Sequence, residues 1–93
     1  MDNGEDILLL DVREEIEYKI NRIEGGRLIP LFLVPLKMNE LDRSKEIIIY
    51  CKTGSRSMDA LRNLKEAGFT RVKNLAGGIM AWIDQVDPSM PRY

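Results

Sequence analysis

The chain has 93 residues, enough for one small domain, with 44% hydrophobic and 31% charged residues. Its 14 basic and 15 acidic side chains leave a formal net charge of -1, which argues against nucleic acid as a partner. No apolar run approaches the ~20 residues that span a bilayer, and the acidic start lacks the basic character of a signal peptide, so we expect a cytoplasmic protein with no membrane partner.

The first elements in chain order are a strand and a helix. Residues 7–10 form a short apolar run that predicts a strand buried on both faces. Asp11 and Glu14, three residues apart, resemble a capping box that opens a helix. The apolar face of that segment is assigned to three isoleucines, Ile16, Ile20 and Ile23.

Strands and helices continue to alternate along the rest of the chain. Residues 21–27 read as a loop. Strand-like or extended pieces are predicted at 28–31, 47–50 and 71–75. Helices are predicted from Pro35 to Leu41, from Ser57 to Gly68 and over 79–86, and residues 87–93 are expected to lie extended over the surface. This alternation predicts an α/β fold with a mainly parallel sheet flanked by helices.

The central strand ends at Cys51, the only cysteine in the chain. Gly54 and Arg56 follow in a short polar loop before the next helix, and Lys52 adds a second positive charge. Inward-facing N–H groups in such a loop, together with the helix N-terminus, favour an anion at its centre. A thiol placed there should ionise readily and act as a nucleophile. The alternative is a structural cysteine buried at the end of a strand.

Two residue counts narrow the chemistry available to Cys51. One cysteine excludes an internal disulfide and a Cys-x-x-Cys zinc or redox pair. The absence of histidine excludes a Cys-His or Ser-His catalytic pair and any His-ligated metal site. We therefore expect no metal, and a thiolate that depends on backbone dipoles and on Lys or Arg.

Asp11 and Arg13 follow the first predicted strand. The carboxyl ends of strands in open α/β sheets border the ligand crevice, which makes both residues candidates for supporting the site. The alternative is a helix cap combined with a surface ion pair.

Four ordered motifs cover nearly the whole chain and resemble a rhodanese-like sulfurtransferase domain. They are Leu10-Asp-Val-Arg13, Ile23-Glu-Gly-Gly26 with Ile29-Pro30, Ile49-Tyr-Cys-Lys-Thr-Gly-Ser-Arg-Ser57, and Asn74-Leu-Ala-Gly-Gly78 leading to Ala81-Trp82. The resemblance implies a sulfurtransferase that needs no cofactor and carries a persulfide on Cys51, taking sulfur from thiosulfate or a protein persulfide. It implies that the persulfide is cradled by the backbone N–H groups of Lys52, Thr53, Gly54, Ser55, Arg56 and Ser57.

A narrower likeness lies in residues 27–31 and in the tail 81–93. These look like the C-terminal rhodanese domain of fused adenylyltransferase–sulfurtransferases, which activate ubiquitin-like sulfur-carrier proteins for molybdopterin, thiamine or cysteine synthesis or for tRNA thiolation. The resemblance implies an adenylated sulfur carrier as the acceptor and a fused adenylyltransferase domain as the usual context.

The chain departs from the family pattern at its start, because family domains usually have another strand and helix before the strand at residue 7. We therefore expect residues 1–93 to be a single, N-terminally truncated rhodanese-like domain, with a sheet edge that is open to pairing. Two other functions remain open. A Cys-dependent phosphatase would have five residues between Cys51 and Arg56, where this chain has four, and a non-catalytic docking module could use the same fold.

Overall fold

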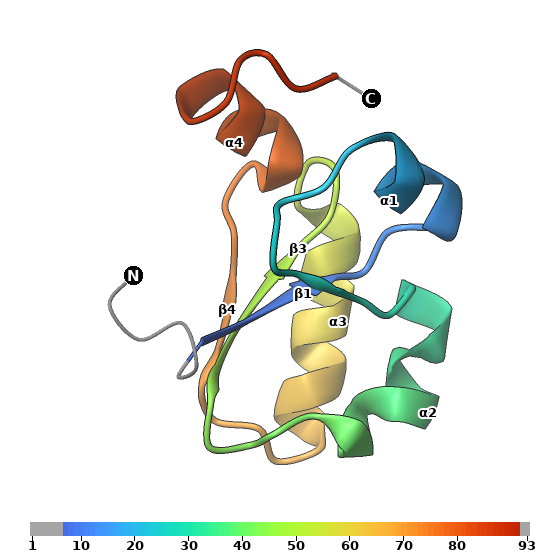
Figure 1. Ribbon diagram of the computed structural model, residues 1–93. Helices are drawn as coiled ribbons and strands as arrows, with labels where there is room; N and C mark the ends of the chain where they lie inside the picture. The colour runs from blue at the N-terminus through green and yellow to red at the C-terminus, as the bar shows by residue number, and fades with distance from the viewer. Residues whose placement is uncertain (1–6, 92–93) are drawn as a thin grey trace.

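The computed structural model describes residues 7–91 as a four-stranded parallel sheet with helices packed against it (Figure 1). The strand order is β2-β1-β3-β4, and Leu10 of β1 lies beside Ile49 of β3. The elements in chain order are β1 (Ile7–Asp11), α1 (Glu15–Ile20), β2 (Arg27–Leu28), the 3-10 turn η2 (Leu31–Leu33), α2 (Val34–Lys37), η3 (Met38–Glu40), β3 (Glu46–Tyr50), α3 (Ser55–Glu66), β4 (Val72–Asn74) and α4 (Gly78–Gln85).

The predicted α/β class and the parallel sheet are confirmed. Each of β1, β3, β4, α3 and α4 lies within two residues of its predicted bounds. Gly68 follows the C-cap of α3 with a φ of 95°, the left-handed conformation expected of a glycine that ends a helix.

The prediction for the helix after β1 was wrong in its starting point and in its buried face. The capping box joins Glu14 and Glu17, so α1 begins three residues later than expected, because the Asp11 carboxylate is taken by Arg13. Ile16 and Ile20 are 63% and 40% exposed, and the buried residue of α1 is Glu17.

Three further segments differ from expectation. The extended piece at 28–31 is only the two-residue strand β2, which passes into η2. The helix that contains Pro35 ends at Lys37 and continues as a 3-10 turn to Glu40. The tail is not helical, as predicted, but it turns rather than lying extended, since the N–H of Met90 donates to the carbonyl of Asp87. Its last two residues lie outside the described part of the chain.

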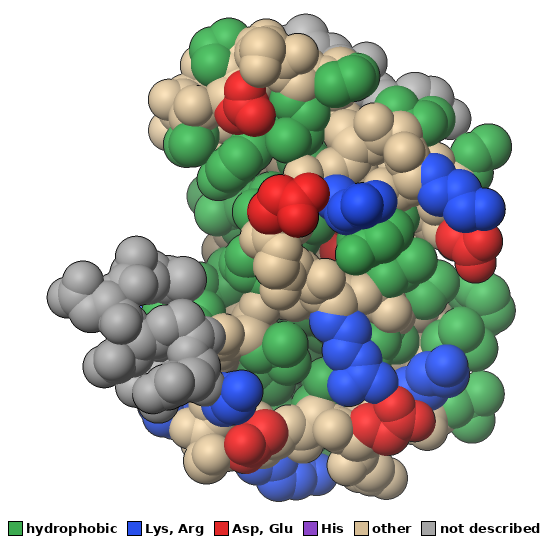
Figure 2. Space-filling model, viewed as in Figure 1, with side chains coloured by type: hydrophobic (Ala, Val, Ile, Leu, Met, Phe, Trp, Pro, Cys, Tyr) green, Lys and Arg blue, Asp and Glu red, His purple; other side chains and the backbone are tan. Residues whose placement is uncertain are grey.

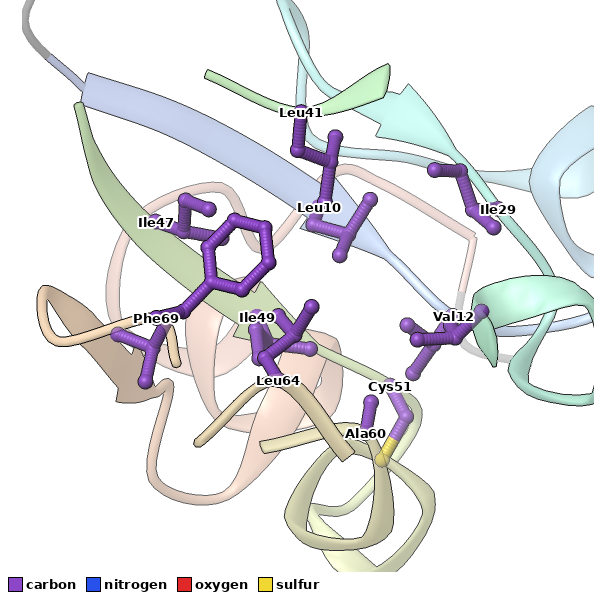
Figure 3. Packing of buried hydrophobic residues seen from close by; sticks show 12 residues of the cluster. Leu10, Val12, Ile29, Leu41, Ile47, Ile49, Cys51, Ala60, Leu64 and Phe69 are labelled. Carbon is purple, nitrogen blue, oxygen red and sulfur yellow. The ribbon is translucent and has the colours of Figure 1, made fainter. Parts of the chain in front are cut away.

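The sheet buries one face more completely than the other. Alternate β-strand residues join α3 and the segment around α2 in a continuous core, which Figure 3 shows around Leu10, Ile47, Ile49 and Leu64. Helix α4 covers the opposite face near the carboxyl ends of the strands, where Tyr50 packs with Ile79 and Ile83. Farther from α4, Leu9 and Ile48 are only half-buried, so the expectation of strands buried on both faces holds for part of the sheet.

On the face shown in Figure 2, acidic and basic side chains are interspersed with apolar ones, as the balanced composition suggests. Among residues 7–91, no helix combines the length and the apolar character needed to cross a membrane.

Candidate active site

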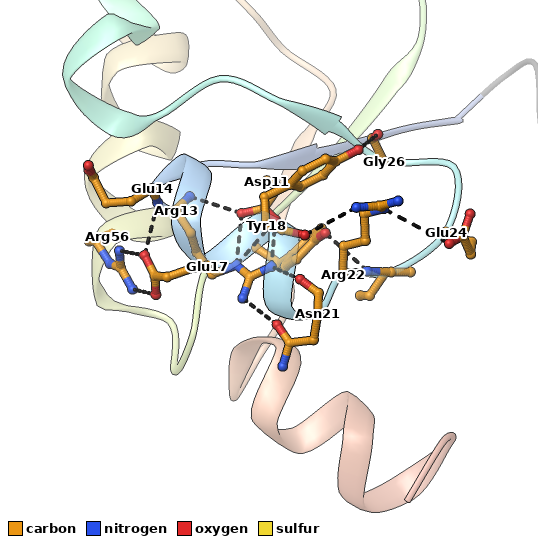
Figure 4. Close-up of polar contacts among 12 residues, drawn as sticks. Asp11, Arg13, Glu14, Glu17, Tyr18, Asn21, Arg22, Glu24, Gly26 and Arg56 are labelled. Atoms are coloured by element: carbon orange, nitrogen blue, oxygen red, sulfur yellow. Dashed lines mark hydrogen bonds and ion pairs between the residues drawn. The ribbon is translucent and has the colours of Figure 1, made fainter. Parts of the chain in front are cut away.

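A buried polar network anchors the segment between β1 and β2. Asp11 and Arg13 are both 0% exposed, which corrects the surface ion pair that the sequence left open. The Arg13 guanidinium donates to both Asp11 oxygens at 2.8–3.2 Å, and to the side-chain and backbone oxygens of Asn21 at 2.7 Å (Figure 4). The Arg13 guanidinium thus donates its hydrogen bonds to Asp11 and Asn21 rather than to the Cys51 loop.

Tyr50 extends the same network to the end of β3. Its hydroxyl accepts the N–H of Ile23 at 3.2 Å, and the Arg13 guanidinium lies 5.7 Å from the centre of its ring. Burial is the first cause that raises the pKa of Tyr50, and the negative charge of Asp11 adds to it, so this hydroxyl stays protonated. The network therefore fixes the residue immediately before Cys51.

Cys51 lies between the core and the N-terminus of α3. Its side chain is 1% exposed and packs within the main hydrophobic cluster, and Figure 3 shows its sulfur beside Ala60. The N–H groups of Gly54 and Ser57 point at the Sγ atom, with N···S distances of 3.0 and 3.4 Å, and the Ser57 hydroxyl lies 3.3 Å from it. The thiol is thus surrounded by hydrogen-bond donors at a helix N-terminus, the arrangement that stabilises an anion.

These contacts favour the thiolate over the thiol. Burial opposes ionisation, but the hydrogen bonds from Ser57 and the backbone N–H groups of Gly54 and Arg56 outweigh it, and together they lower the pKa of Cys51. The geometry therefore suits a nucleophilic sulfur whose negative charge is held by the loop backbone.

Gly54 and Gly78 make this packing possible. Gly54 is the N-cap of α3 with a φ of 123°, which an L side chain rarely adopts, and its N–H donates to the sulfur. A Cβ on Gly78 would lie 2.5 Å from the carbonyl oxygens of Cys51 and Lys52. Gly78 belongs to one of the sequence motifs, but the motif did not explain why a glycine is needed there. The structure gives the reason, which is the close approach of two backbone segments.

The start of α4 holds the outer side of the loop. The N–H of Ile79 donates to the Cys51 carbonyl at 2.9 Å, and that of Met80 donates to the Lys52 carbonyl at 3.2 Å. The carbonyls of Cys51 and Lys52 thus face α4, while the N–H groups of Gly54 and Ser57 face the sulfur.

The structure separates the side chains of the loop into two groups. Ser57 is buried against Cys51, whereas Thr53 and Ser55 are exposed and Lys52 is half-buried. The guanidinium of Arg56 does not turn to the thiol. It makes two hydrogen bonds to the carboxylate of Glu17 on α1, at 2.7 and 2.9 Å (Figure 4).

Two polar residues of this region were missed by the sequence reasoning as site residues. Glu17 is 8% exposed, and its hydrogen bond to Arg56 is the largest cause that lowers its pKa to about 2. Asn74, at the end of β4, has its Oδ1 atom 2.5 Å from the Ser57 hydroxyl. Asn74 was visible within a motif, but no local spacing links Glu17 to Arg56, 39 residues away.

Within residues 7–91, no group of three or more His, Cys, Asp or Glu side chains is placed to hold a metal ion. The described residues offer a single thiol whose pKa is lowered by its hydrogen bonds, a backbone cradle for negative charge and a neighbouring Arg–Glu pair.

Comparison with known families gives a consistent result. A family model described as "Rhodanese-like domain" matches residues 1–85. The chain is 40% identical over 95 residues to the "Probable adenylyltransferase/sulfurtransferase MoeZ" of Mycobacterium tuberculosis, covering 100% of this chain and 24% of that protein. It therefore spans about a quarter of the length of that relative. It is also 40% identical over 78 residues to a "Sulfurtransferase" of Allochromatium vinosum, covering 84% of this chain and 73% of the relative.

The fold is also similar to solved structures. The crystal structure of a rhodanese-related protein from Thermoplasma volcanium superposes with a TM-score of 0.82 at 30% identity, covering 97% of this chain and 86% of that one.

Proposed function

The chain belongs to the rhodanese-like domain family, and from this premise we propose that it is a sulfurtransferase that carries sulfane sulfur on Cys51. The observation that supports this most directly is the convergence of the N–H groups of Gly54 and Ser57 on the Cys51 sulfur at the N-terminus of α3. A negatively charged persulfide needs the same stabilisation as the thiolate that forms it.

The first half of the reaction loads the sulfur. The Cys51 thiolate attacks the sulfane sulfur of a donor, either thiosulfate or a protein persulfide. A new S–S bond forms at Cys51, the S–S bond of the donor breaks, and the leaving group (sulfite or a thiolate) departs with the bonding electron pair.

The second half unloads the sulfur. With cyanide, the carbon attacks the outer sulfur, thiocyanate leaves and the Cys51 thiolate returns. In the cell the proposed acceptor is the adenylated C-terminal glycine of a ubiquitin-like sulfur carrier. There the outer sulfur attacks the acyl carbon and displaces AMP, and a thiol reductant then releases the thiocarboxylate. The relation to MoeZ supports this acceptor and a fused adenylyltransferase domain, with residues 1–93 forming one domain of a longer protein.

The remaining site residues are assigned roles within this proposal. Lys52, Thr53, Gly54, Ser55, Arg56 and Ser57 form the persulfide cradle. Asp11 and Arg13 support it indirectly, since their network fixes Tyr50 at the end of β3. No metal or organic cofactor takes part.

Intact-mass spectrometry tests the proposal. The parent chain is incubated with thiosulfate and, separately, with a protein persulfide, with Cys51→Ser in parallel. We expect a gain of one sulfur, about 32 Da, only in the parent chain, reversed by cyanide or dithiothreitol. A folded parent chain that gains no sulfur from either donor would refute the proposal and favour a docking module.

A further inference from the structure

Glu17 occupies a fixed position against the Cys51 loop. It is the buried residue of α1, and its Oε1 and Oε2 atoms accept hydrogen bonds from the two terminal nitrogens of Arg56 (Figure 4). The backbone N–H of Glu14 donates to the same Oε1 atom at 2.9 Å. The carboxylate is therefore held from two sides and cannot turn away without losing three hydrogen bonds.

This contact changes what Arg56 can offer to an incoming molecule. An arginine in the loop beside a reactive sulfur is well suited to bind a negatively charged donor through paired N–H groups. Here a carboxylate of the same chain already occupies those groups, and the Arg–Glu pair has no net charge. The neighbouring Glu14 carboxylate adds further negative charge close enough to act on Arg56.

We infer that Glu17 is a specificity-determining residue, which cancels the charge of Arg56 and so discriminates against dianionic reagents at Cys51. For sulfur donors, the inference rests on the function proposed above. It predicts that thiosulfate, with two negative charges, is a poorer donor for this site than a chemically matched monoanion.

The physical reason is the charge of the two reacting groups. The thiolate repels an anionic donor, and a cation beside the sulfur offsets that repulsion by an amount that grows with the charge of the donor. Because Glu17 cancels most of the attraction that Arg56 would provide, the electrostatic repulsion that remains is larger for a dianion than for a monoanion. The effect should weaken at high ionic strength, since the Arg56 side chain is 33% exposed.

The first test reads the charge at Cys51 without any sulfur transfer. Cys51 is alkylated with iodoacetate, an anion, and with iodoacetamide, its neutral analogue, in the parent chain and in Glu17→Gln. A changed thiol pKa alters both rates equally, so the ratio of the two rates isolates the local charge. We expect Glu17→Gln to raise the iodoacetate-to-iodoacetamide ratio about fivefold at low salt.

Glu15→Gln is the matched control. It removes the same charge from the same helix, but Glu15 is exposed and pairs with Lys19 rather than with the loop. Its ratio should stay within about 1.5-fold of the parent value, because an exposed charge acts through water of high dielectric constant. Glu17→Ala provides a second variant if the glutamine does not fold. An unchanged ratio in the folded Glu17 variants, or an equal rise in Glu15→Gln, would overturn the inference.

The second test uses two sulfur donors that differ by one charge. Thiosulfate and methanethiosulfonate both transfer a sulfane sulfur, releasing sulfite and methanesulfinate respectively. Glu17→Gln should lower the KM for thiosulfate about fivefold more than the KM for methanethiosulfonate, with little change in kcat, and added salt should reduce the difference. Equal effects on both donors, or an effect confined to kcat, would contradict a charge-selecting role.

The two proposals fail in different ways. If neither donor loads the parent chain but the alkylation ratio shifts as expected, the sulfurtransferase proposal is wrong and the control of charge by Glu17 stands. If sulfur loads normally and the alkylation ratio does not change, the sulfurtransferase proposal stands and the control of charge by Glu17 is wrong.

Discussion

Replacing Arg13 by methionine tests the buried network that supports the site. Methionine keeps most of the apolar stem of the side chain but removes the guanidinium, which leaves the fully buried Asp11 carboxylate without its cation and Asn21 without two hydrogen bonds. Removing one partner of a buried ion pair typically costs 3–5 kcal/mol, so we expect a loss of about 4 kcal/mol. At roughly 0.05–0.15 kcal/mol per residue, the free energy of unfolding of the whole chain is only about 5–14 kcal/mol, so this loss would be a large part of it.

Urea unfolding followed by circular dichroism measures this loss. With an m-value of roughly 1.5 kcal/mol/M, a loss of about 4 kcal/mol should lower the midpoint by about 2.7 M. Arg27→Met is the matched control, because its ion pair with Glu40 is about half exposed and should contribute at most ~1 kcal/mol. Losses of the same size in both variants, or a loss below about 1 kcal/mol for Arg13→Met, would show that the buried network is not a main support of the fold.

Three other predictions concern the site. Ser57→Ala removes a hydroxyl that lies 3.3 Å from the sulfur, so the pKa of Cys51 should rise; the pH dependence of iodoacetamide alkylation measures it, and an unshifted profile would contradict the role of Ser57. Gly78→Ala places a Cβ against two carbonyl oxygens, so we expect destabilisation of about 2 kcal/mol or more and slower sulfur loading; unchanged unfolding would contradict the close approach. The pKa of Glu17 is lowered from 4.5 to about 2, so its contribution to stability is present above pH 4.5 and is lost as the pH falls toward 2. Glu17→Gln should therefore make the free energy of unfolding less dependent on pH in this range. An unchanged pH dependence would contradict a stabilising role for the Glu17 carboxylate.

The parts of the molecule that could be predicted from sequence are those set by neighbouring residues. The apolar runs at β1 and β3, the polar loop after Cys51 and the glycine at the end of α3 are local signals, and each appears where the pattern placed it. The parallel arrangement follows from their alternation, because a parallel pair needs a crossover that a helix can supply.

The remainder depends on contacts between distant segments. The spacing of a capping box fits both Asp11 with Glu14 and Glu14 with Glu17, and only the tertiary partners of Arg13 decide between them. The same holds for Arg56, whose positive charge looked available to the sulfur until α1 brought Glu17 against it. Sequence alone predicted which residue types form the candidate site, but not which of their charges are already neutralised.

The backbone contact between the loop and α4 has a consequence for how the protein can change. The peptide groups at Cys51 and Lys52 are oriented from outside by the Ile79 and Met80 N–H groups, in the same short loop whose inner N–H groups face the sulfur. The packing of α4 and the pKa of the Cys51 thiol are therefore linked through the loop backbone, so we expect a substitution beneath α4 that never approaches the sulfur to change its rate of alkylation.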